Sequence, residues 1–427
     1  MKILFNFRYL SRKVLRDNLY TNYVVSEISR NEKNSKLNLY CDKYINNTIS
    51  YAKKNILAYR NFKNLKCIED FPIIDRQDLL HSKCYYPSGI KQYFGVKGKT
   101  SGTTGTPLEI VRSYMSIIWE QAFIKRHWSW SGFKDGMRRA TLRGDDVVPL
   151  SQSDPPFWFY NRYDNQLLIS SRHLKLTNLS SIINRLNDFS PFILQAYPST
   201  AFLIADFLDK NDIKLSIPFV YTGSEILYPY QRELIEKRIG KVMDFYGMAE
   251  RVAFASECEF GNLHVNTDYS YVEIVDDNGC KTNDYGYVVG TTFHNMLMPL
   301  IRYKLSDRTR WKEGVCPCGR VYPMIEPIQG KFEDLIYDSE CNPVSPSLVT
   351  FAFKGVKNIE CSQVAQVAKG KWEIRILPSS NFTLSDGNKV LQNIRENIDK
   401  NLILSLKIVD SIERTKSAKY RWILNEM

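Results

Sequence analysis

The spacing of hydrophobic and polar positions changes along the 427-residue chain. Over residues 1–70, charged residues alternate with apolar ones at near-helical spacing, as in YINNTISYAKKNILAYR, which predicts a polar and mostly helical segment. From about 100 to 330, short apolar runs such as PFILQAYPS and IPFVYTGSE are separated by Gly, Pro and Asp, and each predicts a buried strand that ends in a loop. Helices follow several of these strands, and strands that alternate with helices favour a largely parallel sheet covered on both faces.

Two further segments have patterns of their own. Between 264 and 312 the chain is richer in alternating and β-branched residues, bounded by Asn-Gly and Asp-Tyr-Gly turns, which is typical of antiparallel strands. After about 331 it restarts as a small α+β unit, in which WEIRIL and LILSLKIV flank a helical stretch near KVLQNIRENIDK. We therefore predict an α/β protein with a helical extension packed on the main domain (1–70), a large domain of mixed parallel sheets with a β-rich subdomain (71–330) and a small α+β domain (331–427).

Length and composition exclude several classes of protein. Aromatic residues make up 13% of the chain, too many for a disordered protein, and a chain this long can bury a substantial core. No stretch approaches the ~20 consecutive apolar residues of a membrane-spanning helix. The start, MKILFNFRYLSRKVLRDN, has one short apolar run broken by Asn6 and Arg8, unlike a signal peptide. We expect a cytoplasmic protein without a membrane span.

The balance of charges points to anionic partners. Lys and Arg number 58 against 46 Asp and Glu, which gives a net charge of +12. Such a balance favours nucleotides, nucleic acid or anionic lipid headgroups. The excess is spread along the chain without a long Lys/Arg block, so we expect no nucleic-acid groove.

The strongest local motif is the sequence TSGTTGTP, residues 100–107. Residues 101–107 contain two glycines and four hydroxyl residues, a composition whose backbone N–H groups and hydroxyls can converge on a phosphate. The alternative is a Ser/Thr/Gly-rich surface turn. A P-loop is excluded, because the pattern that would end at Gly98-Lys99-Thr100 requires glycine at position 93, which is Tyr93.

Four further motifs follow in order, and with the loop they resemble the adenylate-forming (acyl/aryl-CoA ligase, ANL-type) superfamily. They are YTGSE (221–225), FYGMAE (245–250), IRYKLSD (301–307) and QGKFED (329–334), and RTKSAK (414–419) resembles the Arg-Thr-x-Ser-Gly-Lys motif of that family. The resemblance runs from about residue 70 to 425. It is closest to phenylacetate–CoA-ligase-like proteins, especially the branch found among capsular-polysaccharide genes. It implies that 71–330 is an adenylation domain and that 331–427 is a mobile lid.

The resemblance assigns a role to each motif. In the family the hydroxyl-rich loop holds the β- and γ-phosphates of ATP, and the turn at Gly223 lets the backbone approach the adenine, since glycine has no side chain to block it. Tyr246 would offer a flat apolar face to the base, and Asp307 would accept hydrogen bonds from the ribose hydroxyls. The implied ATP site consists of Ser101, Gly102, Thr103, Thr104, Gly105, Gly223, Ser224, Glu225, Tyr246, Gly247, Asp307 and Lys331.

Two residues are the implied catalytic groups, Glu250 and Lys419. Glu250 would coordinate Mg²⁺, which prefers carboxylate and phosphate oxygens. Lys419 would bridge the α-phosphate and the acyl carboxylate, delivered by a lid that swivels about 331–334 between half-reactions. In this chemistry a carboxylate attacks the α-phosphorus of ATP and pyrophosphate leaves, so that positioning and charge neutralisation carry the catalysis.

Four positions depart from the family pattern. Ala249 stands where threonine is usual and lacks its hydroxyl, and Lys331 replaces arginine, which keeps the charge but loses bidentate geometry. Ser306 and Ala418 each replace a common glycine. None of these changes removes a carboxylate or the lysine, although each bears on activity or on the choice of acceptor.

Cysteine and histidine form a second constellation. Cys258 and His264 are followed about fifty residues later by Cys316 and Cys318, and three thiolates with one imidazole suit tetrahedral structural Zn²⁺. The C-x-C spacing is tighter than the usual C-x₂-C, so buried thiols beside an unrelated histidine stay the alternative. The capsule-associated branch often carries a similar C-x-C-G-R segment, which favours zinc. The other six of the nine cysteines form no cluster, and free thiols are expected there.

Three functions from different classes follow from these observations. The first is an ATP-dependent ligase that forms an acyl-adenylate from an aryl or acyl carboxylic acid and passes the acyl group to CoA. The second passes it instead to an amine of a sugar or carrier in polysaccharide assembly, and the third is a non-catalytic zinc protein that binds nucleic acid. The carboxylates Glu250 and Asp307 together with Lys419 favour the first two. The expected cofactors are ATP, Mg²⁺, CoA and a structural Zn²⁺, and a homodimer is left open.

Overall fold

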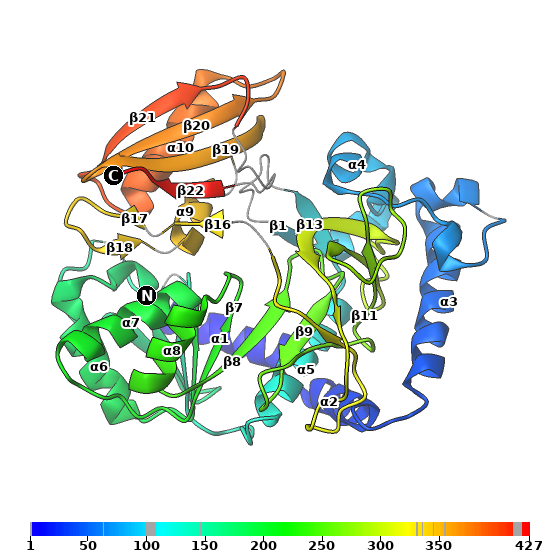
Figure 1. The fold of residues 1–427 in the computed structure, drawn as a ribbon, viewed down its shortest axis with the longest axis horizontal. Helices are drawn as coiled ribbons and strands as arrows, with labels where there is room; N and C mark the ends of the chain where they lie inside the picture. Colours follow the sequence, from blue (N-terminus) through cyan, green and yellow to red (C-terminus); the bar gives the residue numbers. More distant parts are fainter. Residues whose placement is uncertain are drawn as a thin grey trace. The chain divides into compact units, whose positions relative to one another are not determined.

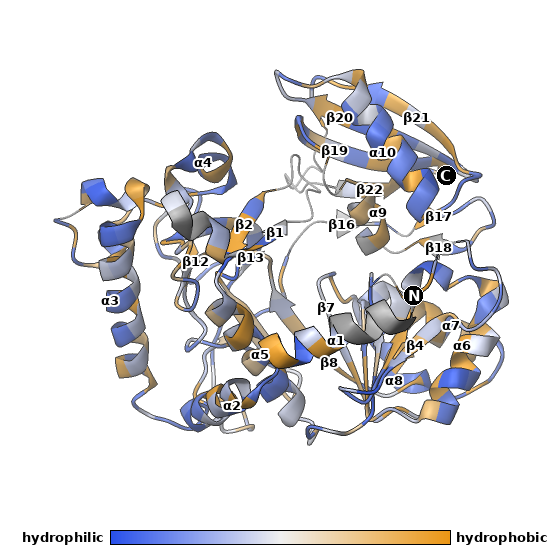
Figure 2. Cartoon of the chain, turned by 180° about the vertical axis from the view of Figure 1, so that it is seen from behind, coloured by the Kyte–Doolittle hydropathy of each residue, from blue (hydrophilic) through white to orange (hydrophobic). Residues whose placement is uncertain are grey.

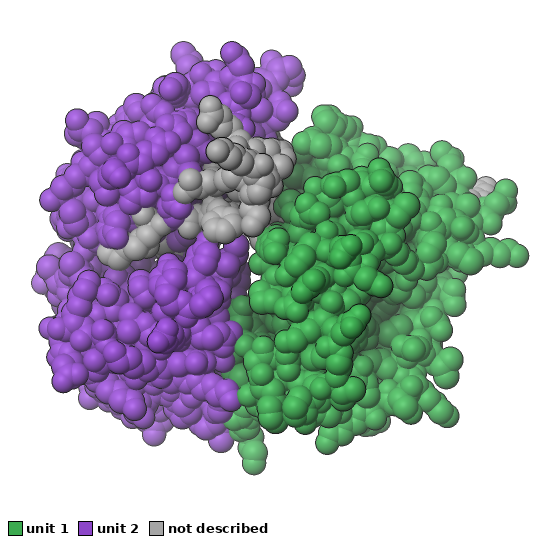
Figure 3. Space-filling model, viewed as in Figure 1, with its two compact units in different colours: residues 1–100, 108–135, 243–330 green, residues 101–107, 136–242, 331–427 purple. Residues whose placement is uncertain are grey.

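The computed structural model describes residues 2–62, 64–99, 108–145, 147–149, 151–329, 332–334, 336–344, 346–353, 356–412 and 421–427. The chain forms two compact units, drawn in different colours in Figure 3. Unit 1 comprises residues 1–100, 108–135 and 243–330, and unit 2 comprises residues 101–107, 136–242 and 331–427. Each unit therefore combines segments that are far apart in the sequence.

Unit 1 begins with the predicted helices (Figure 1). α2 buries Thr21, Val24 and Ile28, one stripe of side chains at helical spacing, and packs on α5. Asp75 caps α4, because its carboxylate accepts hydrogen bonds from the backbone N–H groups of the first turn. The helices of this unit are α1 (Lys2–Arg16), α2 (Leu19–Asn31), α3 (Leu37–Asn55), α4 (Arg76–His81) and α5 (Tyr114–Ser129), with 3₁₀ turns at Leu57–Phe62, Ile68–Asp70, Lys83–Tyr85 and Gly89–Phe94.

The strands of unit 1 form three groups. β1 (Val96–Lys99) pairs with β2 (Glu109–Arg112), and the antiparallel sheet predicted for 264–312 is present as β11 (Ser270–Val275), β12 (Gly286–Thr292) and β13 (Tyr303–Thr309). A further run of neighbouring strands has the order β14-β15-β10-β9-β8, and residues 243–247 of β8 (Lys241–Gly247) belong to unit 1. The other strands of that run are β9 (Phe254–Glu257), β10 (Leu263–Val265), β14 (Trp311–Lys312) and β15 (Met324–Ile325).

Residues 136–242 of unit 2 form the predicted alternation of strands and helices. β7, β6, β3 and β5 are parallel neighbours, and β4 closes the edge as an antiparallel strand. Their apolar residues, such as Leu194 and Val220, share one fully buried core with the helices, as expected for strands covered by helices. The elements are β3 (Arg139–Leu142), β4 (Trp158–Asn161), β5 (Gln166–Ile169), α6 (Leu176–Phe189), β6 (Ile193–Ala196), α7 (Pro198–Lys210), β7 (Phe219–Gly223) and α8 (Pro229–Arg238), with a 3₁₀ turn at Ser171–His173.

Residues 332–427 of unit 2 have a sheet of their own, in the order β16-β22-β19-β20-β21. The predicted strand–helix–strand is present, since β20 pairs in parallel with β21 and the amphipathic α10 connects them (Figure 2). Gly370 turns the chain between β19 and β20 at φ +64°, a conformation that favours glycine. The elements are β16 (Phe332–Glu333), β17 (Ile336–Tyr337), β18 (Pro343–Val344), α9 (Pro346–Phe353), β19 (Ile359–Ala368), β20 (Lys371–Pro378), α10 (Leu384–Asn397), β21 (Ile403–Ile408) and β22 (Arg421–Asn425).

The predicted fold class is confirmed: the protein is mixed α/β with parallel and antiparallel strands, and its C-terminal residues carry a separate sheet. The three-part division at residues 70/71 and 330/331 stays a prediction. Among the described helices, none combines the length and the apolar character that crossing a bilayer requires.

Candidate functional site

A cluster of carboxylate and tyrosine side chains lies in unit 1, where β8 ends and β13 passes. Tyr246, near the end of β8, donates a hydrogen bond from Oη to Oδ2 of Asp307 on β13, at 2.8 Å. Glu250 follows β8 in a turn, and Tyr303 Oη at the start of β13 lies 3.5 Å from Glu250 Oε1. Tyr246 and Tyr303 belong to the same apolar cluster. Tyr246 and Glu250, which precede Asp307 by 61 and 57 positions, are thus brought to the same place as Asp307.

Burial sets the protonation of this cluster. Glu250 is only 8% exposed, and burial raises the pKa of its carboxyl, a change that Arg76 and Arg112 oppose and Asp307 reinforces. Burial and the neighbouring Asp307 carboxylate raise the pKa of Tyr246 well above its usual range, so that its hydroxyl keeps its proton and donates. A buried carboxylate whose charge is disfavoured gains from a hard cation, and the oxygen donor of Glu250 fits Mg²⁺.

The turn that carries Glu250 packs closely on β12. A Cβ atom at Gly290 would lie 2.0 Å from the carbonyl oxygen of Val252, so glycine is required for this contact. Arg251 adopts φ +60° and donates from Nη1 to the carbonyl oxygen of Ser116 on α5, at 2.6 Å. The turn is therefore held from both sides, and this fixes the direction of the Glu250 side chain.

Two cations of this site were missed by the sequence analysis. Arg112, at the end of β2, donates from Nη2 to the carbonyl oxygen of Ala249, at 2.9 Å, and its positive charge opposes the rise in the Glu250 pKa. Arg76, the first residue of α4, acts on Glu250 and Tyr303 in the same direction. Neither belongs to a family motif. The one available signal was the place of Arg112, seven residues beyond Gly105 of the hydroxyl-rich loop.

The predicted adenine motif lies in unit 2, at the end of β7. Ser224 has φ +70°, an uncommon conformation for a residue other than glycine, directly after Gly223. Glu225 accepts a hydrogen bond at Oε2 from the backbone N–H of Ser199, at 3.1 Å, in the first turn of α7. A carboxylate at a helix N-terminus stabilises the unpaired N–H groups there, so this contact orders the turn.

Several predicted residues lie outside the described part of the chain. They are Ser101, Gly102, Thr103, Thr104 and Gly105 of the hydroxyl-rich loop, together with Lys331 and Lys419. Among the described ATP-site residues, Gly247 ends β8 and pairs with Phe254 of β9.

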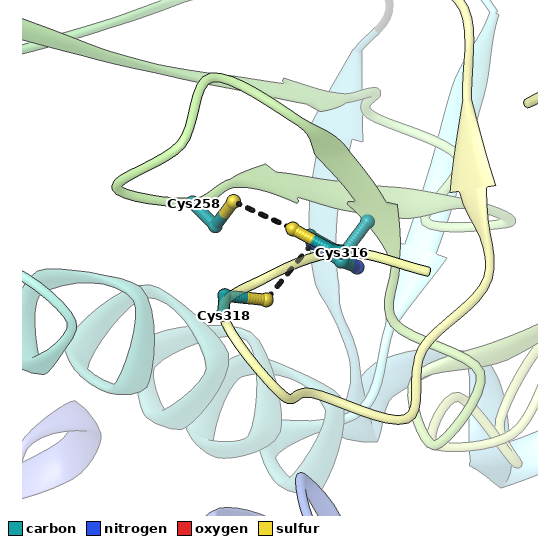
Figure 4. A group of neighbouring side chains, drawn as sticks. Cys258, Cys316 and Cys318 are labelled. Atoms are coloured by element: carbon teal, nitrogen blue, oxygen red, sulfur yellow. Dashed lines mark hydrogen bonds between the residues drawn. The ribbon is translucent and has the colours of Figure 1, made fainter. Parts of the chain in front are cut away.

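The second constellation comes together in unit 1. Cys258 follows β9, His264 lies on β10, and Cys316 and Cys318 lie in the turn after β14. Their donor atoms all lie within 4.8 Å of one another. The Cys258 and Cys316 sulfurs are 3.6 Å apart, and His264 Nε2 is 3.4 Å from Cys318 Sγ. Figure 4 shows the three cysteine side chains converging on one point.

The thiols differ in ionisation although they are neighbours. Burial opposes ionisation of Cys316, but hydrogen bonds from the backbone N–H and thiol of Cys318 and from the Asn262 amide outweigh it and lower the pKa of Cys316 to about 6. Burial raises the pKa of Cys258 and raises that of Cys318 to about 11. One thiolate beside two thiols is what a crowded sulfur cluster adopts when the sulfurs compete for a single negative charge.

The surroundings of this cluster orient its ligands. His264 Nδ1 lies 3.0 Å from the carbonyl oxygen of Tyr322, so that Nδ1 holds the proton and Nε2 faces the sulfurs. Arg320 lies over the ring of Trp130, at 4.0 Å from its centroid, and both contact the Glu32 carboxylate. Three sulfurs and one imidazole nitrogen with these partners are a donor set that fits tetrahedral zinc.

Comparison with known proteins gives relatives along almost the whole chain. Protein CapK from Staphylococcus aureus is 26% identical over 97% of this chain and 95% of its own length. The phenylacetate-coenzyme A ligase of Thermus thermophilus is 23% identical over 70% of this chain and 72% of its own length. Residues 336–426 match the family model described as the CapK C-terminal domain.

Solved structures support the fold. A structure of 2-hydroxyisobutyryl-CoA ligase in complex with 2-HIB-AMP and CoA in the thioesterification state aligns with a TM-score of 0.57 and 17% identity, over 93% of this chain and 91% of that one. An open conformation of the same enzyme with 2-HIB-AMP and CoA aligns with a TM-score of 0.51 and 16% identity, over 89% of this chain and 90% of that one. The chain is thus similar to CapK over nearly its whole length and to phenylacetate-coenzyme A ligase over most of it, its residues 336–426 match the CapK C-terminal domain, and it shares the fold of 2-hydroxyisobutyryl-CoA ligase.

Proposed function

We propose that the protein is an ATP-dependent, AMP-forming acid–CoA ligase. The observation that carries the proposal is the Tyr246–Asp307 hydrogen bond with Glu250 in the same buried cluster. It joins an aromatic ring, a carboxylate suited to ribose hydroxyls and a carboxylate suited to Mg²⁺, the three groups that ATP requires of this region. The phenylacetate-coenzyme A ligase relatives and the fold shared with 2-hydroxyisobutyryl-CoA ligase support it.

The first half-reaction forms an acyl-adenylate. A carboxylate oxygen of the acid attacks the α-phosphorus of ATP, a new P–O bond forms, the bond to the β-phosphate oxygen breaks, and pyrophosphate leaves. Asp307 holds the ribose and Tyr246 holds Asp307, so the nucleotide is fixed while the attack proceeds. Arg112 and Arg76 add positive charge near Glu250, where negative charge must be neutralised. Mg²⁺, when bound at Glu250, supplies further neutralisation of phosphate charge.

The second half-reaction transfers the acyl group. The sulfur of CoA attacks the acyl carbon, the thioester bond forms, and AMP leaves with the electron pair of the broken C–O bond. We assign Lys419 to the adenylation step and Lys331 to the hinge of the lid, in keeping with the family motifs at these positions. The hydroxyl-rich loop, Ser101 to Gly105, is the proposed site of the β- and γ-phosphates.

A different acceptor is the second candidate. The alignment with CapK covers 97% of this chain, whereas the alignment with the phenylacetate-coenzyme A ligase covers 70%. In addition, Ala249 lacks the hydroxyl group that is usual at this position in the ligases. An acceptor other than CoA, such as the amine of a sugar or carrier, is compatible with these observations. The adenylation step would then be unchanged and only the nucleophile would differ.

We further propose that Cys258, His264, Cys316 and Cys318 bind a structural zinc ion. Their mutual distances and the proton position of His264 support this assignment. The site is closed by four protein ligands, which leaves no open position for catalysis and suits a structural role.

One experiment separates these functions. ATP–pyrophosphate exchange is measured with a panel of aryl and aliphatic carboxylic acids, and acyl transfer is then followed with CoA or with amino sugars by mass spectrometry. We expect exchange that depends on Mg²⁺ and on one class of acid, followed by a thioester when CoA is added. Exchange followed by an amide but no thioester selects the second acceptor, and absence of exchange with every acid overturns the proposal in favour of a binding protein.

A further inference from the structure

The corner between α1 and α2 exposes an unusual concentration of large apolar side chains. Six of the 25 exposed large hydrophobic residues of the described chain fall within the 14 residues 10–23. Leu19 is 88% exposed and Val14 is 61% exposed. We name these six residues the α1–α2 patch; they are Leu10, Val14, Leu15, Leu19, Tyr20 and Tyr23.

The patch lies on helices that are packed and capped. Tyr9 is 3% exposed, and α1 and α2 both pack on α5. Asp17, in the turn between the helices, accepts a hydrogen bond from Lys125 of α5 at 2.8 Å and pairs with Lys13 at 3.0 Å. Asn18 caps α2 by accepting two backbone N–H groups. Tyr9 of α1 and the buried stripe of α2 therefore already pack inward, and the six side chains of the patch are exposed.

The charge of this corner is positive. Residues 9–23 contain the basic residues Arg12, Lys13 and Arg16 and one acidic residue, Asp17, which gives a net charge of +2. Arg16 is exposed, and Arg12 lies over the ring of Tyr9. An exposed apolar face flanked by arginine and lysine is the composition of helices that lie in a membrane interface.

The aromatic residues of the patch agree with this environment. Tyr20 and Tyr23 stack with ring centroids 5.9 Å apart, and their side chains are 43% and 56% exposed. Tyrosine has an apolar ring and a polar hydroxyl, and it is enriched at the headgroup level of bilayers.

We propose that the α1–α2 patch is a peripheral docking surface for an anionic lipid bilayer. A second copy of the chain fits this surface poorly, because a symmetric contact would bring two positively charged patches together, each with a net charge of +2. An anionic lipid surface complements the charge and covers the leucines at the same time. The attachment is peripheral, since none of the described helices is suited to crossing a bilayer. The inference stands apart from the proposed ligase activity.

The test is co-sedimentation of the full chain with vesicles of phosphatidylcholine alone or mixed equally with phosphatidylglycerol. We expect binding to the mixed vesicles in 50 mM NaCl, little binding to phosphatidylcholine, and release in 500 mM NaCl because salt screens the charges. Arg12→Gln with Arg16→Gln should weaken binding about 25-fold, since each charge near an anionic surface contributes about fivefold. Lys54→Gln with Lys66→Gln, two exposed lysines elsewhere in unit 1, is the matched control and should bind as the parent does.

The apolar contribution is tested separately. Val14→Ser, Leu15→Ser and Leu19→Ser combined should weaken vesicle binding at least tenfold, whereas Leu57→Ser, Leu384→Ser and Ile403→Ser, at comparably exposed sites elsewhere, should not. All six positions are exposed, so circular dichroism and thermal melting should match the parent. Failure of the parent to bind mixed vesicles in 50 mM NaCl overturns the proposal, as does equal binding by the patch variant. Sedimentation velocity that shows a parental dimer and a monomeric patch variant would assign the surface to a second copy instead.

Discussion

The carboxylate cluster and the thiol cluster of unit 1 are assembled in the same way but are in different states. Each joins residues more than 50 positions apart, and each lies at the end of a strand. In the thiol cluster the four donor atoms lie within 4.8 Å of one another. His264 Nδ1, which points away from the sulfurs, is held by a hydrogen bond to the Tyr322 carbonyl oxygen. In the carboxylate cluster Asp307 and Glu250 each face a tyrosine hydroxyl, and burial opposes the charge of Glu250.

From this difference we expect the thiol cluster to stabilise the fold and the carboxylate cluster to bind a ligand. If the converging donors of the thiol cluster share the proposed metal ion, the contribution of that ion appears as stability. A buried carboxylate whose pKa is raised costs stability unless a cation arrives, and such costs are typical of binding and catalytic sites. Changes to the first cluster should therefore act on folding, and changes to the second on activity.

The largest effect is expected from removal of the zinc ligands. Structural zinc contributes on the order of 10 kcal/mol to small domains, and in a unit with several apolar clusters we expect about half of that. Cys258→Ala with Cys316→Ala should remove about one equivalent of zinc, measured by atomic emission, and lower the melting temperature. Cys67→Ala with Cys361→Ala, two thiols outside the cluster, should keep the metal and the melting temperature. Parent protein that is purified without metal and melts normally would contradict the assignment.

The second effect falls on catalysis. Glu250→Gln should lower the rate of ATP–pyrophosphate exchange a hundredfold or more, about 3 kcal/mol, because a neutral amide is a poor Mg²⁺ ligand. Stability should stay level or rise, since the substitution removes a buried charge that burial disfavours.

Glu273→Gln is the matched control for this variant. Glu273 is also buried but forms a two-bond ion pair with Arg302, at 3.1 Å for both contacts. Its loss leaves a buried arginine without its partner and should cost about 3–5 kcal/mol of stability with no selective loss of exchange. Equal exchange by Glu250→Gln and the parent would remove Glu250 from the site.

The sequence predicted the fold class, and it singled out Tyr246, Glu250 and Asp307 and the four residues of the thiol cluster, for different reasons. The strands and helices followed from local periodicity, which depends on neighbouring residues alone, as in the buried stripe Val24–Ile28 of α2. Residues such as Asp307 were predicted because they stand in a family motif. Cys258 and His264 were predicted from residue type and spacing, and the structure brings them together with Cys316 and Cys318.

The sequence could not predict the cations around Glu250. Arg112 reaches the turn at Ala249 because the β1–β2 pair passes beside it, a contact between residues 137 positions apart that no local pattern records. The Tyr246–Asp307 bond was likewise absent from the prediction, which gave the two residues separate roles toward the nucleotide. Pairwise contacts of this kind depend on how the strands pack, and that is set by the whole core.

The third effect concerns pH and a residue outside both clusters. His294 stacks on Trp119 at 3.8 Å with an interplanar angle of 7°, and burial lowers its pKa to about 3, although its hydrogen bond with the Asp268 carbonyl oxygen opposes the change. In the unfolded chain His294 has a pKa near 6.5, so between pH 6.5 and pH 3 it binds a proton there but stays neutral in the folded chain. Stability is therefore present above about pH 6.5 and is lost as the pH falls toward 3, by about 1.4 kcal/mol per pH unit.

This pH effect is checked by urea unfolding between pH 7 and pH 5, followed by tryptophan fluorescence. His294→Phe keeps a ring against Trp119 but cannot take up a proton, so the free energy of unfolding should fall less steeply with pH than in the parent. The difference between the two slopes should be about 1.4 kcal/mol per pH unit below pH 6. Parallel slopes would show that His294 is protonated equally in both states.

The smallest effect tests how the carboxylate cluster is organised. Tyr246→Phe keeps the aromatic face but removes the hydroxyl that donates to Asp307 at 2.8 Å, at a cost of about 1 kcal/mol. If the hydroxyl positions Asp307 for the ribose, the KM for ATP should rise about fivefold while kcat stays nearly constant, because the contact exists before and during the reaction alike. Tyr303→Phe, which loses the longer contact of 3.5 Å to Glu250, is the matched control and should change KM less. A fall in kcat at constant KM for Tyr246→Phe would instead place the tyrosine hydroxyl among the groups that act only in the transition state, and Asp307 would then hold its position through the β13 backbone alone.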